Sequence, residues 1–111
     1  MFKEANYLDF IPRISAKLQW RALADGLVQI SKPRDSILDR LVRSLFFTPD
    51  KFIIDLDKMG SFIWKNIDGK NTVYDLAQLV EDKFGDEAQP LYRRLIEYMR
   101  ILENNGFIDY L

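Results

Sequence analysis

The hydrophobic pattern of the first third of the chain predicts an arm followed by a β-hairpin. Residues 1–15 mix apolar and charged positions and are expected to form an extended arm. Residues 16–33 contain two short runs of alternating character, separated by Asp25 and Gly26. Both residues tolerate positive φ angles, so an Asp-Gly pair between such runs is a strong hairpin signal. The pattern therefore predicts two antiparallel strands, which end at Pro33.

The next segment changes to helical periodicity and then returns to a strand. Apolar positions in residues 35–47 repeat at i, i+1, i+4 and i+5, which predicts an inserted helix that ends before Pro49. Residues 52–56 are rich in β-forming side chains and lack proline, which predicts a third strand. A period of two then places the side chains of Phe52, Ile54 and Leu56 on one face, and those of Ile53 and Asp55 on the other.

Three more helices are predicted after this strand. Asp57 can cap a short helix that runs from about residue 58 to residue 66. Thr72 and Asp75 resemble a capping box with Asp in place of the usual Glu, and they open the second helix. Pro90 fits the first turn of the last helix.

These elements describe a single α+β domain over residues 1–111. Their order is β-β-α-β-α-α-α, with a helix-turn-helix-like pair at the end. We therefore predict a winged helix-turn-helix-like fold, in which a three-stranded antiparallel sheet packs on three C-terminal helices and the helix at 35–47 is an insertion. Residues 107–108 are expected to pair with the sheet or to pack beneath it. Trp20 and Trp64 are expected to be core anchors.

Composition excludes most catalytic chemistry. The chain contains no cysteine and no histidine, which removes thiol nucleophiles, thiolate and imidazole metal ligands, and imidazole acid–base catalysis. We therefore expect no catalytic residue, no metal and no cofactor. The first residues lack a continuous apolar region, and no uncharged run is long enough to span a bilayer. A cytoplasmic protein without membrane contact is the expectation.

Charge bears on nucleic acid as a partner. Residues 1–51 carry nine Lys/Arg against six Asp/Glu, whereas residues 52–111 carry seven against eleven. Winged helices often place their last helix in the major groove, and Arg93, Arg94 and Arg100 lie on that helix. Phosphate contacts dominate such binding, so the acidic second half disfavours DNA. A DNA-binding regulator, and a structural or homodimerisation subunit of a larger assembly, remain the alternatives.

The stretch from Leu56 to Val73 resembles the central signature of the PqqD-like family, which is named after pyrroloquinoline quinone synthesis protein D. The signature combines an apolar strand end, a small residue, an apolar-Trp pair, an Asp-Gly turn and a Thr-Val pair. The resemblance covers residues 52–108. It departs from the family at Asp57, where Asn is usual, and in the helix at 35–47. The matching positions are Leu56, Gly60, Ile63, Trp64, Asp68, Gly69, Thr72, Val73, Leu76, Ala77, Phe84, Gly85, Leu95, Leu102, Gly106, Phe107 and Ile108.

This resemblance implies a non-catalytic peptide chaperone, also called a RiPP recognition element. Such domains bind the leader segment of a ribosomally made precursor peptide. They present it to a modifying enzyme, often a radical S-adenosylmethionine enzyme, in cofactor or natural-product biosynthesis. In this fold the leader is expected to add a strand beside the third strand, against the last helix.

The residues themselves suit such a site. The strand at 52–56 carries one charge and no proline, as an edge open to a peptide requires. Apolar residues of the last helix cover roughly 220° at 100° per residue, whereas a core contact needs a little over about 100°. Covering of the strand by the 35–47 helix or a second subunit, and ordinary packing of both helix flanks, are the alternatives. The predicted peptide-binding residues are Phe52, Ile53, Ile54, Asp55, Leu56, Arg94, Tyr98 and Ile101.

Overall fold

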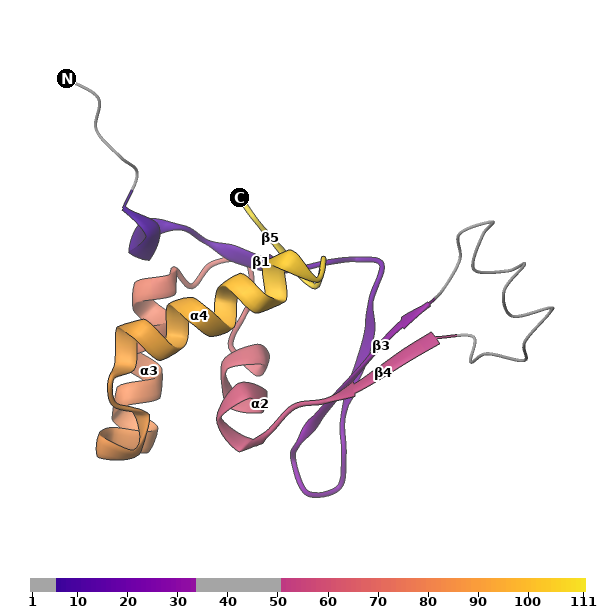
Figure 1. The fold of residues 1–111 in the computed structure, drawn as a ribbon, viewed down its shortest axis with the longest axis horizontal. Coiled ribbons are helices and arrows are strands. Elements are labelled where there is room, and N and C mark those ends of the chain that lie inside the picture. The colour runs from indigo at the N-terminus through magenta and orange to yellow at the C-terminus, as the bar shows by residue number, and fades with distance from the viewer. Residues whose placement is uncertain (1–5, 34–50) are drawn as a thin grey trace.

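The computed structural model of the protein describes residues 6–33 and 51–111, so the predicted helix at 35–47 lies outside the described residues. Figure 1 shows helices on one side of the fold and a long, narrow sheet on the other. The elements are η1 (Tyr7–Asp9), β1 (Pro12–Ile14), β2 (Gln19–Ala22), β3 (Val28–Pro33), β4 (Lys51–Asp55), α2 (Lys58–Lys65), α3 (Val73–Phe84), η2 (Gly85–Ala88), α4 (Leu91–Asn104) and β5 (Ile108–Tyr110).

Strands β2, β3 and β4 form the predicted three-stranded antiparallel sheet, with β3 in the middle. The hairpin between β2 and β3 turns at Gly26, whose φ of 84° lies in the left-handed region that favours glycine. The side chain of Lys65 donates a hydrogen bond to the Gly26 carbonyl at 2.9 Å. This hydrogen bond connects the hairpin turn to the C-terminal end of α2.

The arm predicted at residues 1–15 is not simply extended. It contains the short helix η1 and the strand β1, and β1 pairs antiparallel with β5 in a separate two-stranded sheet. Ile108 pairs with Ile14 and therefore does not join the main sheet. Phe107 and Ile108 are instead buried in the same hydrophobic core as Val28 and Ile30, in line with the alternative that they pack beneath the sheet. Sequence patterning could not reveal this pairing because its partners lie almost a whole chain apart and each strand has three residues.

The hydrophobic core lies between the main sheet and helices α2, α3 and α4. Trp64 is fully buried, as predicted, and it is the largest side chain in the core. The prediction for Trp20 is wrong, because this side chain remains 42% exposed and only the edge of its ring stacks against Trp64. Trp20 lies on β2, which among the described residues pairs with a strand on one side only. The buried side chains of α4 are Leu91, Leu95, Met99 and Leu102.

Polar side chains cap the N-terminal ends of α2 and α3 as the sequence predicts. Asp57 accepts the Gly60 N–H at 2.7 Å and caps α2. Thr72 and Asp75 form a reciprocal capping box at the start of α3, with hydrogen bonds of 3.0 and 2.9 Å. Ser61 is the one buried polar residue among those described, and it accepts the Val28 N–H and donates to the Leu56 carbonyl. Helix α2 is thereby hydrogen-bonded to the main sheet.

None of the helices in the described part of the chain has the length and apolar character that a bilayer crossing requires.

Replacement of Thr72 by Ala tests the capping box. The change removes the acceptor of the Asp75 N–H, so we expect the free energy of unfolding to fall by about 1 kcal/mol. Urea denaturation followed by circular dichroism measures this loss. The control Thr72→Ser keeps the hydroxyl and should remain close to the wild-type protein; equal losses in both variants would contradict the assignment of the stabilisation to the cap.

Candidate functional site

Strand β4 lies at an edge of the main sheet. It pairs with β3 along one side, and within residues 6–33 and 51–111 no strand pairs with its other side. The Leu56 N–H donates to the Val28 carbonyl at 2.9 Å, which fixes the phase of the hydrogen bonds between the two strands. Backbone groups alternate in direction along an antiparallel strand. The N–H and C=O groups of Ile53 and Asp55 must therefore point away from β3, toward the open edge.

The side chains of β4 divide between the two faces of the sheet as the period of two predicts. Ile54 and Leu56 are partly buried and pack against the core. Ile53 is 57% exposed on the opposite face, where Asp55 accepts a hydrogen bond from the Gln29 amide at 3.0 Å. The Phe52 side chain lies outside the described part of the structure. Among the described residues, this edge thus combines outward-pointing backbone groups, which no other strand pairs with, and an apolar inner face.

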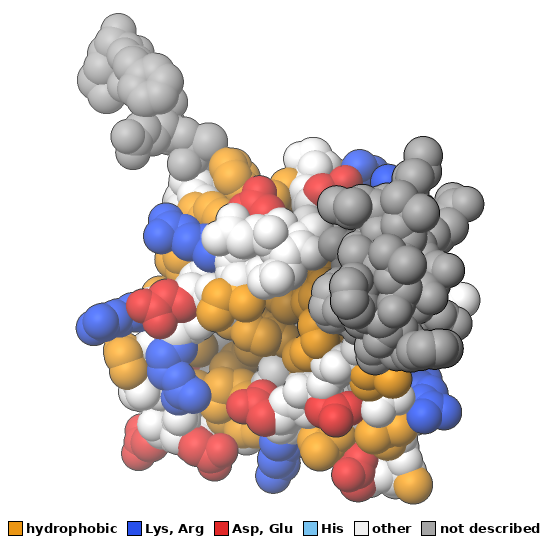
Figure 2. All heavy atoms as spheres, turned by 45° about the vertical axis from the view of Figure 1, so that its right-hand side comes forward, with side chains coloured by type: hydrophobic (Ala, Val, Ile, Leu, Met, Phe, Trp, Pro, Cys, Tyr) orange, Lys and Arg blue, Asp and Glu red, His pale blue; other side chains and the backbone are white. Residues whose placement is uncertain are grey.

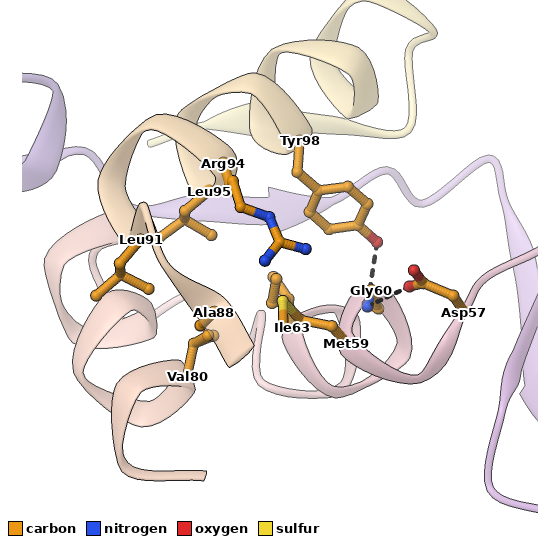
Figure 3. Close-up of a pocket in the computed structure, with 10 residues that line it drawn as sticks. All are labelled: Asp57, Met59, Gly60, Ile63, Val80, Ala88, Leu91, Arg94, Leu95 and Tyr98. Atoms are coloured by element: carbon orange, nitrogen blue, oxygen red, sulfur yellow. Dashed lines mark hydrogen bonds between the residues drawn. The ribbon is translucent and has the colours of Figure 1, made fainter. Parts of the chain in front are cut away.

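A pocket of about 100 Å³ lies between α2 and α4, just beyond the end of β4. Figure 3 shows its walls: α2 forms one side, α4 the other, and residues from α3 and η2 close one end. Five of the lining side chains are almost fully buried and apolar, so the bottom of the pocket is hydrophobic. The lining residues are Asp57, Met59, Gly60, Ile63, Val80, Ala88, Leu91, Arg94, Leu95 and Tyr98.

Gly60 lets α4 approach α2 closely at the mouth of this pocket. The Tyr98 hydroxyl donates to the Gly60 carbonyl at 3.0 Å. A Cβ atom at residue 60 would lie 2.8 Å from an Asp57 carboxylate oxygen, closer than real Cβ atoms come to another atom, and 3.0 Å from the Tyr98 hydroxyl, so both side chains would have to shift. Burial, and to a lesser extent the negative charge of Asp57, raises the pKa of Tyr98. The phenol therefore keeps its proton, and this hydrogen bond, across the neutral pH range.

Arg94 reaches over the pocket from α4. Its guanidinium donates to the Glu87 carbonyl at 2.7 Å, which holds the side chain against η2. In Figure 3 the guanidinium lies between the two helices, and the Tyr98 ring separates it from Asp57. In the described portion of the chain, no carboxylate forms an ion pair with Arg94. One fixed positive charge is therefore available at the mouth.

Ile101 continues the same flank of α4. It lies seven residues after Arg94 and three after Tyr98, spacings that place all three on one side of a helix. Its side chain is 57% exposed and does not line the pocket. Figure 2 shows hydrophobic side chains gathered in a hollow in the middle of one face, with acidic and basic side chains around it.

A second hollow, of about 350 Å³, lies on the outer side of the main sheet. Its polar side chains already bond to one another: Arg21 donates to Gln29, and Gln29 donates to Asp55. Trp20 and Ile53 supply its apolar part. Because its Arg21 and Gln29 side chains are already hydrogen-bonded within the sheet, this hollow makes a weaker candidate site than the pocket beside β4.

The structure therefore brings together only part of the predicted site. Arg94 and Tyr98 line the pocket, Ile54 and Leu56 pack on the core nearby, and Ile101 lies farther along α4. Sequence reasoning missed the contribution of α2, namely Met59, Gly60 and Ile63. The available signal was the small residue three positions after the Asp57 cap, where a close helix contact needs glycine. Among the residues in view, no group of His, Cys, Asp or Glu could hold a metal ion.

Comparison with known proteins gives one match. A family model described as Coenzyme PQQ synthesis protein D (PqqD) matches residues 45–108, more than half of the chain. Searches of the curated proteins and of the solved structures found no match. The matched segment includes β4, the helices α2, α3 and α4, and the pocket between α2 and α4. By this match, and in agreement with the resemblance of its sequence, the chain belongs to the PqqD family.

Proposed function

We propose that this protein is a non-catalytic peptide-binding module that captures the leader segment of a ribosomally made precursor peptide. The leader adds a strand to the open edge of β4 and packs against α4, and the module presents it to a modifying enzyme of the radical S-adenosylmethionine class. Family membership supports an accessory, peptide-binding role of the kind found in PQQ synthesis. The single observation that carries the strand-addition mode is the outward direction of the Ile53 and Asp55 backbone groups.

Strand addition divides the work between backbone and side chains. Main-chain hydrogen bonds supply affinity, and pockets for alternate side chains supply specificity. Here the backbone groups of β4 supply affinity. Specificity comes from Tyr98, Ile101 and the pocket beneath Arg94. Both parts lie on regular elements, so a peptide meets a preformed surface, which lowers the entropy lost on binding.

The same geometry gives little support to DNA binding. In a winged helix that binds DNA, the last helix needs unpaired cations for the phosphates. Arg93 lies 3.7 Å from the carboxylate of Glu97, and Glu103 adds a second negative charge to the same helix. The side chains of α4 that face the pocket are mainly apolar.

Titration with the short peptides encoded beside this gene tests the proposal. We expect the backbone amide signals of β4 and of the Arg94–Ile101 flank of α4 to shift in nuclear magnetic resonance spectra, because these groups would contact the peptide. A shuffled peptide of the same composition is the control. Shifts that are confined to the chain termini, or no binding at millimolar peptide, would rule out the proposed site.

Replacement of Ile53 by Pro tests strand addition directly. Proline removes the outward N–H of β4 but none of the hydrogen bonds to β3, a position where an edge strand tolerates proline. We expect the fold to persist and peptide affinity to fall by about tenfold or more. The loss has two causes: the peptide loses one backbone hydrogen bond, and proline alters the extended conformation of the strand. The control Ile53→Thr keeps the N–H and the β-propensity. If Ile53→Pro binds as tightly as Ile53→Thr, the peptide does not pair with β4.

Two exposed apolar residues of α4 show which flank meets the peptide. Ile101 is 57% exposed and Tyr92 is 40% exposed on the opposite flank, so a bound peptide could reach either side chain. Burial of the Ile101 side chain on binding contributes about 1 kcal/mol, so Ile101→Ser should lower the affinity for the peptide about fivefold. Isothermal titration calorimetry measures this affinity. Tyr92→Ser should leave affinity unchanged. The reverse ranking would place the peptide on the other flank.

A further inference from the structure

We infer that the pocket under Arg94 is a two-part specificity site, which accepts one aliphatic side chain of the bound peptide and pairs its neighbouring carboxylate with the Arg94 guanidinium. This inference rests on the proposed function and adds to it the chemistry of the recognised segment. The leader should therefore carry an aliphatic residue next to, or within two positions of, Asp or Glu.

The volume of the pocket limits the size of the side chain that it accepts. Its bottom is made of Ile63, Val80, Ala88, Leu91 and Leu95, which are between 1% and 5% exposed. The volume of about 100 Å³ is smaller than the roughly 150 Å³ of a dry engineered cavity that holds benzene. An aliphatic side chain fits this space, whereas an aromatic ring would have to push α2 and α4 apart.

The rigid contact at Gly60 makes that separation costly. Tyr98 is hydrogen-bonded to the Gly60 carbonyl, and its ring is partly buried against the hydrophobic core. Widening the pocket would break this hydrogen bond and expose the ring. The pocket therefore selects by size as well as by polarity.

Arg94 supplies the positive charge that pairs with the carboxylate of the peptide. A guanidinium carries five N–H donors, and the Glu87 carbonyl takes one of them. The contact with Glu87 holds the guanidinium above the apolar bottom, so a carboxylate that pairs with it must come from a residue within two positions of the inserted side chain. A charge held in place in this way loses little entropy when it binds.

Asp57 gives the site a direction. Its carboxylate lines the same pocket but lies beyond Tyr98, where it accepts the Gly60 N–H. A peptide carboxylate is therefore attracted to the Arg94 end and repelled from the Asp57 end. Because of this asymmetry, the acidic residue of the bound segment lies near Arg94 and η2, and the segment continues from there toward Asp57.

Selection from a random library of peptides of about twelve residues tests the inference without knowledge of the natural leader. The displayed library is selected in parallel on the full-length wild-type protein and on R94Q. We expect wild-type selections to enrich an aliphatic residue close to Asp or Glu, and R94Q selections to lose the acidic preference. The best wild-type peptide and its copy with the amide in place of the acid are then synthesised. The amide should bind the wild-type protein about tenfold more weakly, and both peptides should bind R94Q equally.

The outcomes separate this inference from the function on which it rests. Peptides that shift the β4 amides but show no acidic preference, or the same preference on R94Q, overturn the reading of Arg94 and leave strand addition standing. Peptides that prefer aromatic over aliphatic side chains overturn the size limit. A selection that enriches nothing, or only peptides that leave β4 unperturbed, overturns the proposed function and this inference together. R93Q is the matched control, because Arg93 pairs with Glu97 and lies outside the pocket; it should retain the wild-type preference.

Discussion

The contact between α2 and α4 at Gly60 is the constraint on which the candidate site depends. The absence of a side chain there lets the Tyr98 hydroxyl reach the Gly60 carbonyl and brings the flank of α4 that carries Arg94 over α2. Helix α2 is in turn joined to the sheet through Ser61, which bonds to both Val28 and Leu56. The edge strand, the pocket and the cation at its mouth are therefore held in one rigid arrangement rather than by separate contacts.

Local rules in the sequence were sufficient for most of the elements. The Asp25-Gly26 turn, the Asp57 cap and the Thr72–Asp75 box each lie where the sequence predicts them. These features depend on residues a few positions apart, so a single sequence contains all the information that they need. The apolar arc of the last helix likewise contains the buried side chains of α4, because helical periodicity records which side faces the core.

The parts that sequence could not provide depend on long-range geometry. The pairing of β1 with β5 joins residues that lie 96 positions apart at Arg13 and Asp109, and no local pattern encodes it. The contact of Arg94 with a backbone carbonyl leaves no trace in sequence, because every residue has a carbonyl. The direction of the backbone groups of Ile53 depends on the register with β3, which the identity of the residue does not determine.

The β1–β5 pair also determines where additional sequence would attach to the fold. Pro12 lies opposite Tyr110, the Leu111 N–H bonds to the Ile11 carbonyl, and the Tyr7 and Tyr110 hydroxyls are hydrogen-bonded. Both ends of the described fold therefore leave from one place, which Figure 1 shows on the side of the helices, away from β4. A tag, a linker or a fused enzyme domain that is attached at either end therefore starts at the β1–β5 pair. From there it need not cross the outer edge of β4.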